Sequence, residues 1–156
     1  VETWLRPRRT RGHVWAVIQA IFEASGESHG TSIAEAARFV ASTWRRKAVV
    51  VIVSDFLDPG PWQAAIATLT GRHQVHAVLV HDPLDARLPF TGLVQIEDAE
   101  TGRSMLVDAS TVAAPADVES RVKALRRAGA RAVAISTEED AFRVLHEHFR
   151  AVGAHR

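Results

Sequence analysis

Hydrophobic positions along this chain change their spacing several times, between alternation or a continuous run, which indicate strands, and recurrence every third or fourth residue, which indicates helices. Val1–Leu5 alternates and predicts a short strand, which the proline- and arginine-rich stretch RPRRTRG ends. The apolar residues between His13 and Ala24 recur at helical spacing and predict a first helix. Ser25–Gly30, with the sequence SGESHG, predicts a loop.

A second helix and a strongly apolar strand follow. Thr31 or Ser32, together with Glu35, forms an N-cap signature. The helix behind it carries one apolar face, made of Ile33, Ala37, Val40 and Trp44. Ala48–Val53 is apolar at every position, which predicts a parallel strand covered by helices on both faces.

The rest of the chain repeats this alternation of helices and strands. A turn at Asp58–Gly60 precedes a helix with Trp62, Ile66 and Leu69 that ends near Gly71, and a strand follows at Gln74–Asp82. Next comes a hairpin of Gly92–Ile96 and Ser104–Val107, with Thr101 and Gly102 at its turn. The last predicted elements are a helix with Val118, Val122 and Leu125 capped by Gly129, a strand at Arg131–Thr137, and a C-terminal helix marked by Phe142, Leu145, Phe149 and Val152. This order predicts an α/β fold: an open, mostly parallel sheet with helices on both faces and the antiparallel hairpin at an edge.

Composition limits the function classes without naming a ligand. A length of 156 residues predicts one domain, residues 1–156. The 19 Lys and Arg nearly balance the 18 Asp and Glu, so no charge bias favours nucleic acid or an anionic membrane as partner. The lack of cysteine excludes disulfides, thiolate metal sites and cysteine nucleophiles. With no signal-peptide pattern and no apolar run of about 20 residues, the cytoplasm is the expected location.

Asp55 is the candidate functional residue, because it follows the apolar strand directly. In open parallel sheets, ligands bind beyond the carboxyl ends of the strands. One alternative is that Asp55 only caps the turn together with Asp58. Another is a phosphoryl-handling enzyme or receiver-like domain with Asp55 as nucleophile. A receiver needs an earlier acidic pair, which is not seen before Asp55, and DFLD separates its acids by two residues where a haloacid-dehalogenase-like phosphatase needs one.

Three stretches carry a resemblance to a known family: GTSIAEAARFV, RRKAVVVIVSDFLD and RHQVHAVLVHDPLDARLPFTGLVQIEDAETGRSMLVD. They resemble the bacterial domain-of-unknown-function family fifty-eight, from Val1 to about Ser110. The combination of several short motifs is more specific than any one of them: Ser54–Phe56, His81–Pro83, Leu88–Pro89 and Asp98–Gly102. The resemblance implies a von Willebrand factor A-like domain encoded beside MoxR-type AAA+ ATPases.

The resemblance also implies a metal-ion-dependent adhesion site with Mg²⁺ or a similar hard cation at the carboxyl edge of the sheet. Thr31 would supply a hydroxyl and Asp55 a carboxylate. Mg²⁺ takes six oxygen ligands and keeps several waters, so a partner's carboxylate can complete its shell. The family's first motif, an aspartate followed by two serines spaced by one residue, does not occur here. We therefore expect cation binding by this chain alone to be weak or absent.

In the full domain that the resemblance implies, Val1–Leu5 corresponds to the third strand. The chain would then lack the first strand, the first helix and the second strand. The missing first strand belongs beside Val49–Val53, and open apolar edges recruit another strand. We therefore expect a homo-oligomer, formed by pairing this edge across a two-fold axis or by moving Val1–Leu5 into the gap.

Two functions from different classes follow from these patterns. The favoured one is a non-enzymatic module that binds a protein partner, assisted by metal, and works with a MoxR-like ATPase in protein maturation or remodelling. The alternative is the phosphoryl chemistry at Asp55. The histidines favour neither function. His146 and His148 are two residues apart and lie on different helix faces, which argues against a zinc pair, and the histidines around one strand are interpreted as structural: His73, His76 and His81.

Overall fold

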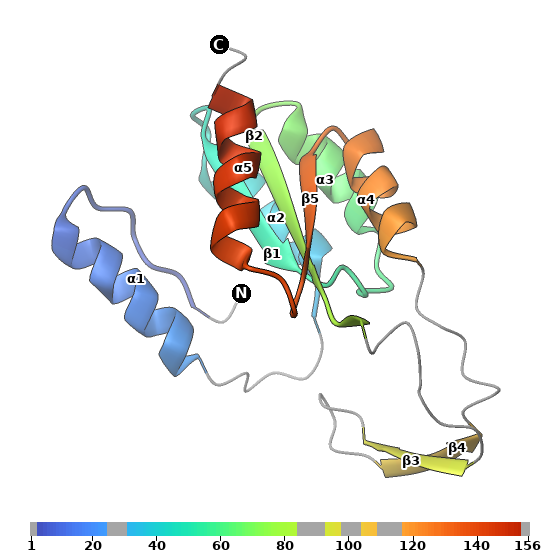
Figure 1. The fold of residues 1–156 in the computed structure, drawn as a ribbon. Helices are drawn as coiled ribbons and strands as arrows, with labels where there is room; N and C mark the ends of the chain where they lie inside the picture. The colour runs from blue at the N-terminus through green and yellow to red at the C-terminus, as the bar shows by residue number, and fades with distance from the viewer. Residues whose placement is uncertain (1–2, 25–30, 84–92, 98–103, 109–116, 154–156) are drawn as a thin grey trace.

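The computed structural model describes residues 3–24, 31–83, 93–97, 104–108 and 117–153, and it has an α/β fold (Figure 1). In chain order the elements are α1 (Arg11–Glu23), α2 (Ile33–Thr43), β1 (Val49–Ser54), α3 (Trp62–Thr70), β2 (Gln74–His81), β3 (Leu93–Glu97), β4 (Ser104–Asp108), α4 (Val118–Arg127), β5 (Arg131–Ser136) and α5 (Ala141–Gly153). From α1 onward this is the predicted order of helices and strands. The predicted loop at residues 25–30 and the hairpin turn at residues 101–102 lie outside the described residues.

The prediction of a strand at Val1–Leu5 is wrong for its described part. Thr3–Leu5 form no strand. The Trp4 ring instead packs edge-on against Phe39 of α2, with 5.3 Å between the ring centroids. A tertiary aromatic contact therefore outweighs the weak alternating pattern of this short segment.

β1, β2 and β5 form a parallel sheet in the order β1-β2-β5. β2 lies in the middle, and its residues Val75–Leu79 are all buried. The predicted hairpin is present, with β3 and β4 paired antiparallel, but it forms a two-stranded sheet of its own and is not an edge of the parallel sheet. β1 therefore has one hydrogen-bonded neighbour and one free edge among the described strands.

Helices cover both faces of the parallel sheet, as predicted. α2, α3 and α4 bury one face and form the main core, whose central residues are Ile33, Ala37, Ile66, Leu69, Ala77, Leu79 and Leu125. α5 lies on the opposite face, over β2 and β5 (Figure 1). None of the helices among the described residues combines the length and apolar character needed to cross a bilayer.

β1 itself departs from the prediction, because its outer face is not covered by a described helix. Val50 and Ile52 pack against the core. The alternating residues Val49, Val51 and Val53 remain 57%, 47% and 65% exposed. α5 covers β2 and β5 but does not extend over β1. Although β1 is apolar on both faces, only its inner face is buried by described residues.

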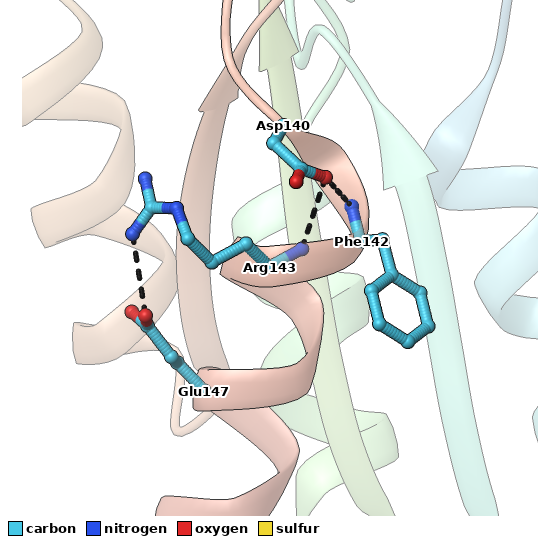
Figure 2. A network of polar contacts seen from close by, with 4 residues as sticks. All are labelled: Asp140, Phe142, Arg143 and Glu147. Atoms are coloured by element: carbon cyan, nitrogen blue, oxygen red, sulfur yellow. Dashed lines mark hydrogen bonds and ion pairs between the residues drawn. The ribbon is translucent and has the colours of Figure 1, made fainter.

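Side-chain caps define three of the helix starts, the first being Thr10 at α1. Ser32, one of the two predicted candidates, caps α2 by accepting a hydrogen bond from the Glu35 amide at 3.2 Å. Asp140 Oδ1 caps α5 by accepting from the amides of Phe142 and Arg143 at 3.0 and 3.2 Å, and Arg143 pairs with Glu147 one turn later (Figure 2).

Candidate functional site

The chain leaves β1 through a tight loop that fixes the position of Asp55. The Ser54 hydroxyl accepts a hydrogen bond from the Phe56 amide at 3.1 Å, and Asp55 Oδ1 accepts one from the Leu57 amide at 3.0 Å. Phe56 has a positive φ of 56°, which is rare for a bulky residue, and its ring is buried 5.5 Å from the Trp62 ring. Burial of Phe56 thus holds a strained backbone and leaves the Asp55 side chain exposed at the end of the strand.

Asp58 and Arg121 tie this loop to two helices. Asp58 Oδ2 accepts from the Ile33 amide at the start of α2 at 2.8 Å, and Oδ1 accepts from the Gly60 amide at 2.7 Å. The buried Arg121 of α4 donates from Nη1 to the Asp55 carbonyl. The second acid of the DFLD stretch is therefore structural: its carboxylate joins the amino end of α2 to the loop after β1.

A groove of about 360 Å³ lies between α2 and β1. Thr31, Ser32 and Ser54 line one part of it, and the remaining lining is apolar and comes from α2, α3 and consecutive residues along β1: Ile33, Ala36, Ala37, Val40, Leu69 and Val50–Val53. Of the two predicted metal ligands, Thr31 thus shares the groove with Ser54, and Asp55 is the next residue along the chain. The structure brings the start of α2 and the end of β1 to the same edge of the sheet.

The free edge of β1 runs along this groove. The Gln74 amide donates to the Ala48 carbonyl, so the backbone groups of Ala48, Val50 and Ile52 face β2. Backbone groups alternate in direction along a strand, so those of Val49, Val51 and Val53 point away from β2. None of the described strands pairs with these amides and carbonyls.

The residues at this edge fit a hard cation only in part. Hydroxyl and carboxylate oxygens are ligands of the kind that Mg²⁺ prefers, but Thr31 and Asp55 are too few to fill six positions, and Asp55 Oδ1 already accepts from Leu57. The described part of the chain contains no group of three or more His, Cys, Asp or Glu that could hold a metal. Any cation here needs further donors from water, a partner or another segment.

A second polar cluster, on the opposite face of the sheet, was not expected from the sequence. His76 Nδ1 of β2 lies 2.9 Å from His148 Nε2 of α5, and Gln74 Nε2 lies 2.9 Å from His76 Nε2. Across the contact between the two rings, one histidine nitrogen donates its hydrogen and the other accepts it. Burial, the adjacent His148 and Arg131 lower the pKa of His76, and burial together with Arg131 and Arg126 lowers the pKa of His148.

This pair joins two elements that are 72 residues apart, so no local spacing could reveal it. The prediction that His146 and His148 do not act together agrees with the geometry: His148 faces β2, whereas the exposed His146 stacks on Phe142 of its own helix. The structural interpretation is supported for His76. His73 is buried too, and its ring nitrogens have no hydrogen-bond partner among the described residues.

The fold resembles one solved structure at a level that supports the fold alone. The crystal structure of conserved hypothetical protein BatB from Bacteroides thetaiotaomicron matches with a TM-score of 0.55 and 12% sequence identity, over 90% of this chain and 69% of that chain.

Mycobacterial relatives are more similar in sequence. Uncharacterized protein MAV169 of Mycobacterium avium is 38% identical over 103 residues, which is 62% of this chain and 61% of that protein. Uncharacterized protein Rv1480 of Mycobacterium tuberculosis is 35% identical over 103 residues, or 62% of this chain and 32% of its own length. The chain thus spans less than two thirds of the first relative and about a third of the second. Residues 1–128 match the family model described as protein of unknown function DUF58, and the chain belongs to that family.

Proposed function

We propose that this chain is a non-enzymatic protein-binding module whose binding surface is the free edge of β1 together with the groove beside it. The observation that carries the proposal is the combination of outward backbone groups at Val49, Val51 and Val53 with an apolar groove along the same strand. An added strand gains main-chain hydrogen bonds from such an edge, and its alternate side chains enter the groove. A second copy of the chain, pairing the same edge across a two-fold axis, is the proposed occupant.

The proposed cation site lies at the end of that edge. Thr31 and Asp55 would hold Mg²⁺ by a hydroxyl and a carboxylate oxygen, and a carboxylate from the partner would complete the shell. The position of both residues at the carboxyl edge of a parallel sheet supports this proposal. Binding of the cation is then coupled to binding of the protein that donates this carboxylate, which in the test below is the ATPase. Neither the ligands of this chain nor the ligands of its partner are sufficient alone to hold the cation.

The physiological partner that we propose is a MoxR-like AAA+ ATPase, with a role in protein maturation or remodelling in the cytoplasm. This part rests on the resemblance to von Willebrand factor A-like domains and is therefore an argument by fold analogy. The single-domain organisation of residues 1–156 is proposed on the same basis.

Edge pairing is tested by comparing Val51→Pro with Val51→Thr by light scattering. Proline removes an outward amide without breaking a bond to β2, whereas threonine keeps the amide and much of the side-chain shape. We expect the proline variant to lose self-association at the edge and the threonine variant to keep it. Equal association of both variants would contradict edge pairing.

The cation site is tested by calorimetric titration of Mg²⁺ and Mn²⁺ into the wild type and Asp55→Ala, with and without the ATPase. We expect metal-dependent capture of the ATPase that the alanine variant loses. Capture that is insensitive to metal and to Asp55 would contradict the cation proposal. A stable acyl-phosphate on Asp55 after incubation with a small phosphodonor would replace the whole proposal by phosphoryl chemistry.

A further inference from the structure

Two apolar surfaces are left uncovered by the described residues of the chain. The first, the α1 face, consists of Val14, Trp15, Ile18, Ile21 and Phe22, which are 60%, 70%, 38%, 70% and 86% exposed. The second, the valine face, consists of the outward side chains of β1, Val49, Val51 and Val53. No residue of α1 is buried. A helix of 13 residues without tertiary packing is marginal in water, so α1 needs a surface to cover.

We propose that α1 of one copy packs on the valine face of a second copy, and that the exchange is reciprocal. The two elements match in length, since a 13-residue helix and a six-residue strand are each about 20 Å long. They also match in polarity. Between Gly12 and Phe22, α1 contains no Asp, Glu, Lys or Arg, so docking desolvates no formal charge of either sign from the middle of the helix.

The attachment of α1 explains why a second copy is the occupant. Upstream of α1, the Trp4 ring is held against Phe39 of α2, and downstream, the Ile33 amide at the start of α2 is held by Asp58. α2 packs on the inner face of the sheet, whereas the valine face is on the outer face. α1 therefore projects as an arm from the α2 side, beyond β1, and not over its own sheet (Figure 1).

The area of this exchange suits a stable dimer. The α1 face and the valine face together contain eight exposed apolar side chains, each worth on the order of 100 Å² of burial. A reciprocal exchange would therefore bury roughly 800 Å² per copy, close to the standard size of a specific protein interface. The exchange uses the side chains of β1 and not its backbone edge, so charged side chains at these positions test it without removing an amide from the edge.

The experiment combines two variants that each disable one surface. Trp15→Glu/Phe22→Glu places charges on the α1 face, and Val53→Glu places one on the valine face. All three residues are exposed, so neither variant should disturb the core. Met105→Glu is the matched control, because Met105 is 63% exposed on β4, which belongs to the separate two-stranded sheet and to neither surface. Association is measured by sedimentation on the full chain over a range of concentrations, and α1 helicity by circular dichroism.

We expect the wild type and the Met105 control to dimerise, with helicity that rises with concentration. Each surface variant alone should bind itself at least tenfold more weakly. An equal mixture of the two should associate again, because the intact α1 of the Val53 variant can occupy the intact valine face of the other. A mixture that associates no more tightly than either variant alone would overturn the proposal. Unchanged dimerisation of the single variants would overturn it too.

Discussion

The sequence makes Asp55 the prominent acid of the DFLD stretch, but the structure predicts that Asp58 matters more for folding. Each Asp58 oxygen accepts one backbone amide, from Ile33 at 2.8 Å and from Gly60 at 2.7 Å, and the side chain is half-buried. The bond to Ile33 also places a negative charge at the amino end of α2, where the helix dipole stabilises it. Asp55 is exposed, and its one bond to a backbone amide goes to Leu57 at 3.0 Å.

The expected magnitude for Asp58→Ala follows from these two bonds. A hydrogen bond to a charged group contributes about 1.5 kcal/mol or more, so losing both should cost about 3 kcal/mol of unfolding free energy. Asp58→Asn keeps one oxygen acceptor and should lose about half of that amount. Asp55→Ala, as the matched control, should lose less than about 1 kcal/mol, because one exposed bond is replaced by water.

Urea denaturation followed by circular dichroism measures these differences. The urea midpoint should be highest for Asp55→Ala, lower for Asp58→Asn and lowest for Asp58→Ala. The slope of the unfolding free energy against urea concentration should stay the same, which would show that stability has changed and the surface exposed on unfolding has not. If Asp58→Ala lost no more stability than Asp55→Ala, the assignment of Asp58 as the acid that joins α2 to the loop would be refuted.

Two further predictions concern the histidine pair and a helix end. Folding lowers the pKa of both His76 and His148, so the unfolded chain binds more protons than the folded chain at acidic pH. The free energy of unfolding should therefore be highest above the unfolded histidine pKa of about 6.5 and should decrease as the pH falls below it. Urea midpoints at pH 7.5 and 5.5 check this, and His148→Leu should reduce the difference. Gly129→Ala should lower the free energy of unfolding by about 1 to 2 kcal/mol, because φ is +86° and a Cβ would lie 2.8 Å from Thr70 Oγ1. Gly12→Ala is the control, because a Cβ there would meet no atom within 4 Å, and it should raise the helicity of α1.

Local pattern was enough to predict most of the elements. Hydrophobic spacing located α1 to α5 and the strands to within a few residues, because apolar side chains recur at the period of each element even in α1, where none is buried. Capping chemistry located the start of α2, where Ser32 and Glu35 behave as the signature requires. The strand predicted at Val1–Leu5 is not formed at Thr3–Leu5, because a pattern of five residues was too short to compete with the Trp4 contact to Phe39.

The candidate site was less predictable, because its geometry depends on contacts between distant segments. The Asp58 bond to Ile33 spans 25 residues, and the Arg121 bond to the Asp55 carbonyl spans 66. Neither has a local signature. Periodicity also does not reveal what covers a face: the sequence of β1 indicates that both faces avoid water, but only the fold shows that the outer one has no described cover.

The two proposed contacts of β1 can form on the same strand at the same time. In a strand, the side chain and the backbone groups of one residue point in perpendicular directions. At Val49, Val51 and Val53 the side chains leave through the outer face, and the amides and carbonyls leave through the free edge. A paired strand would therefore not displace a docked helix. Two edge-paired copies would place their valine faces side by side, and the two α1 arms would then cover one continuous apolar surface, so each contact would strengthen the other without sharing an atom.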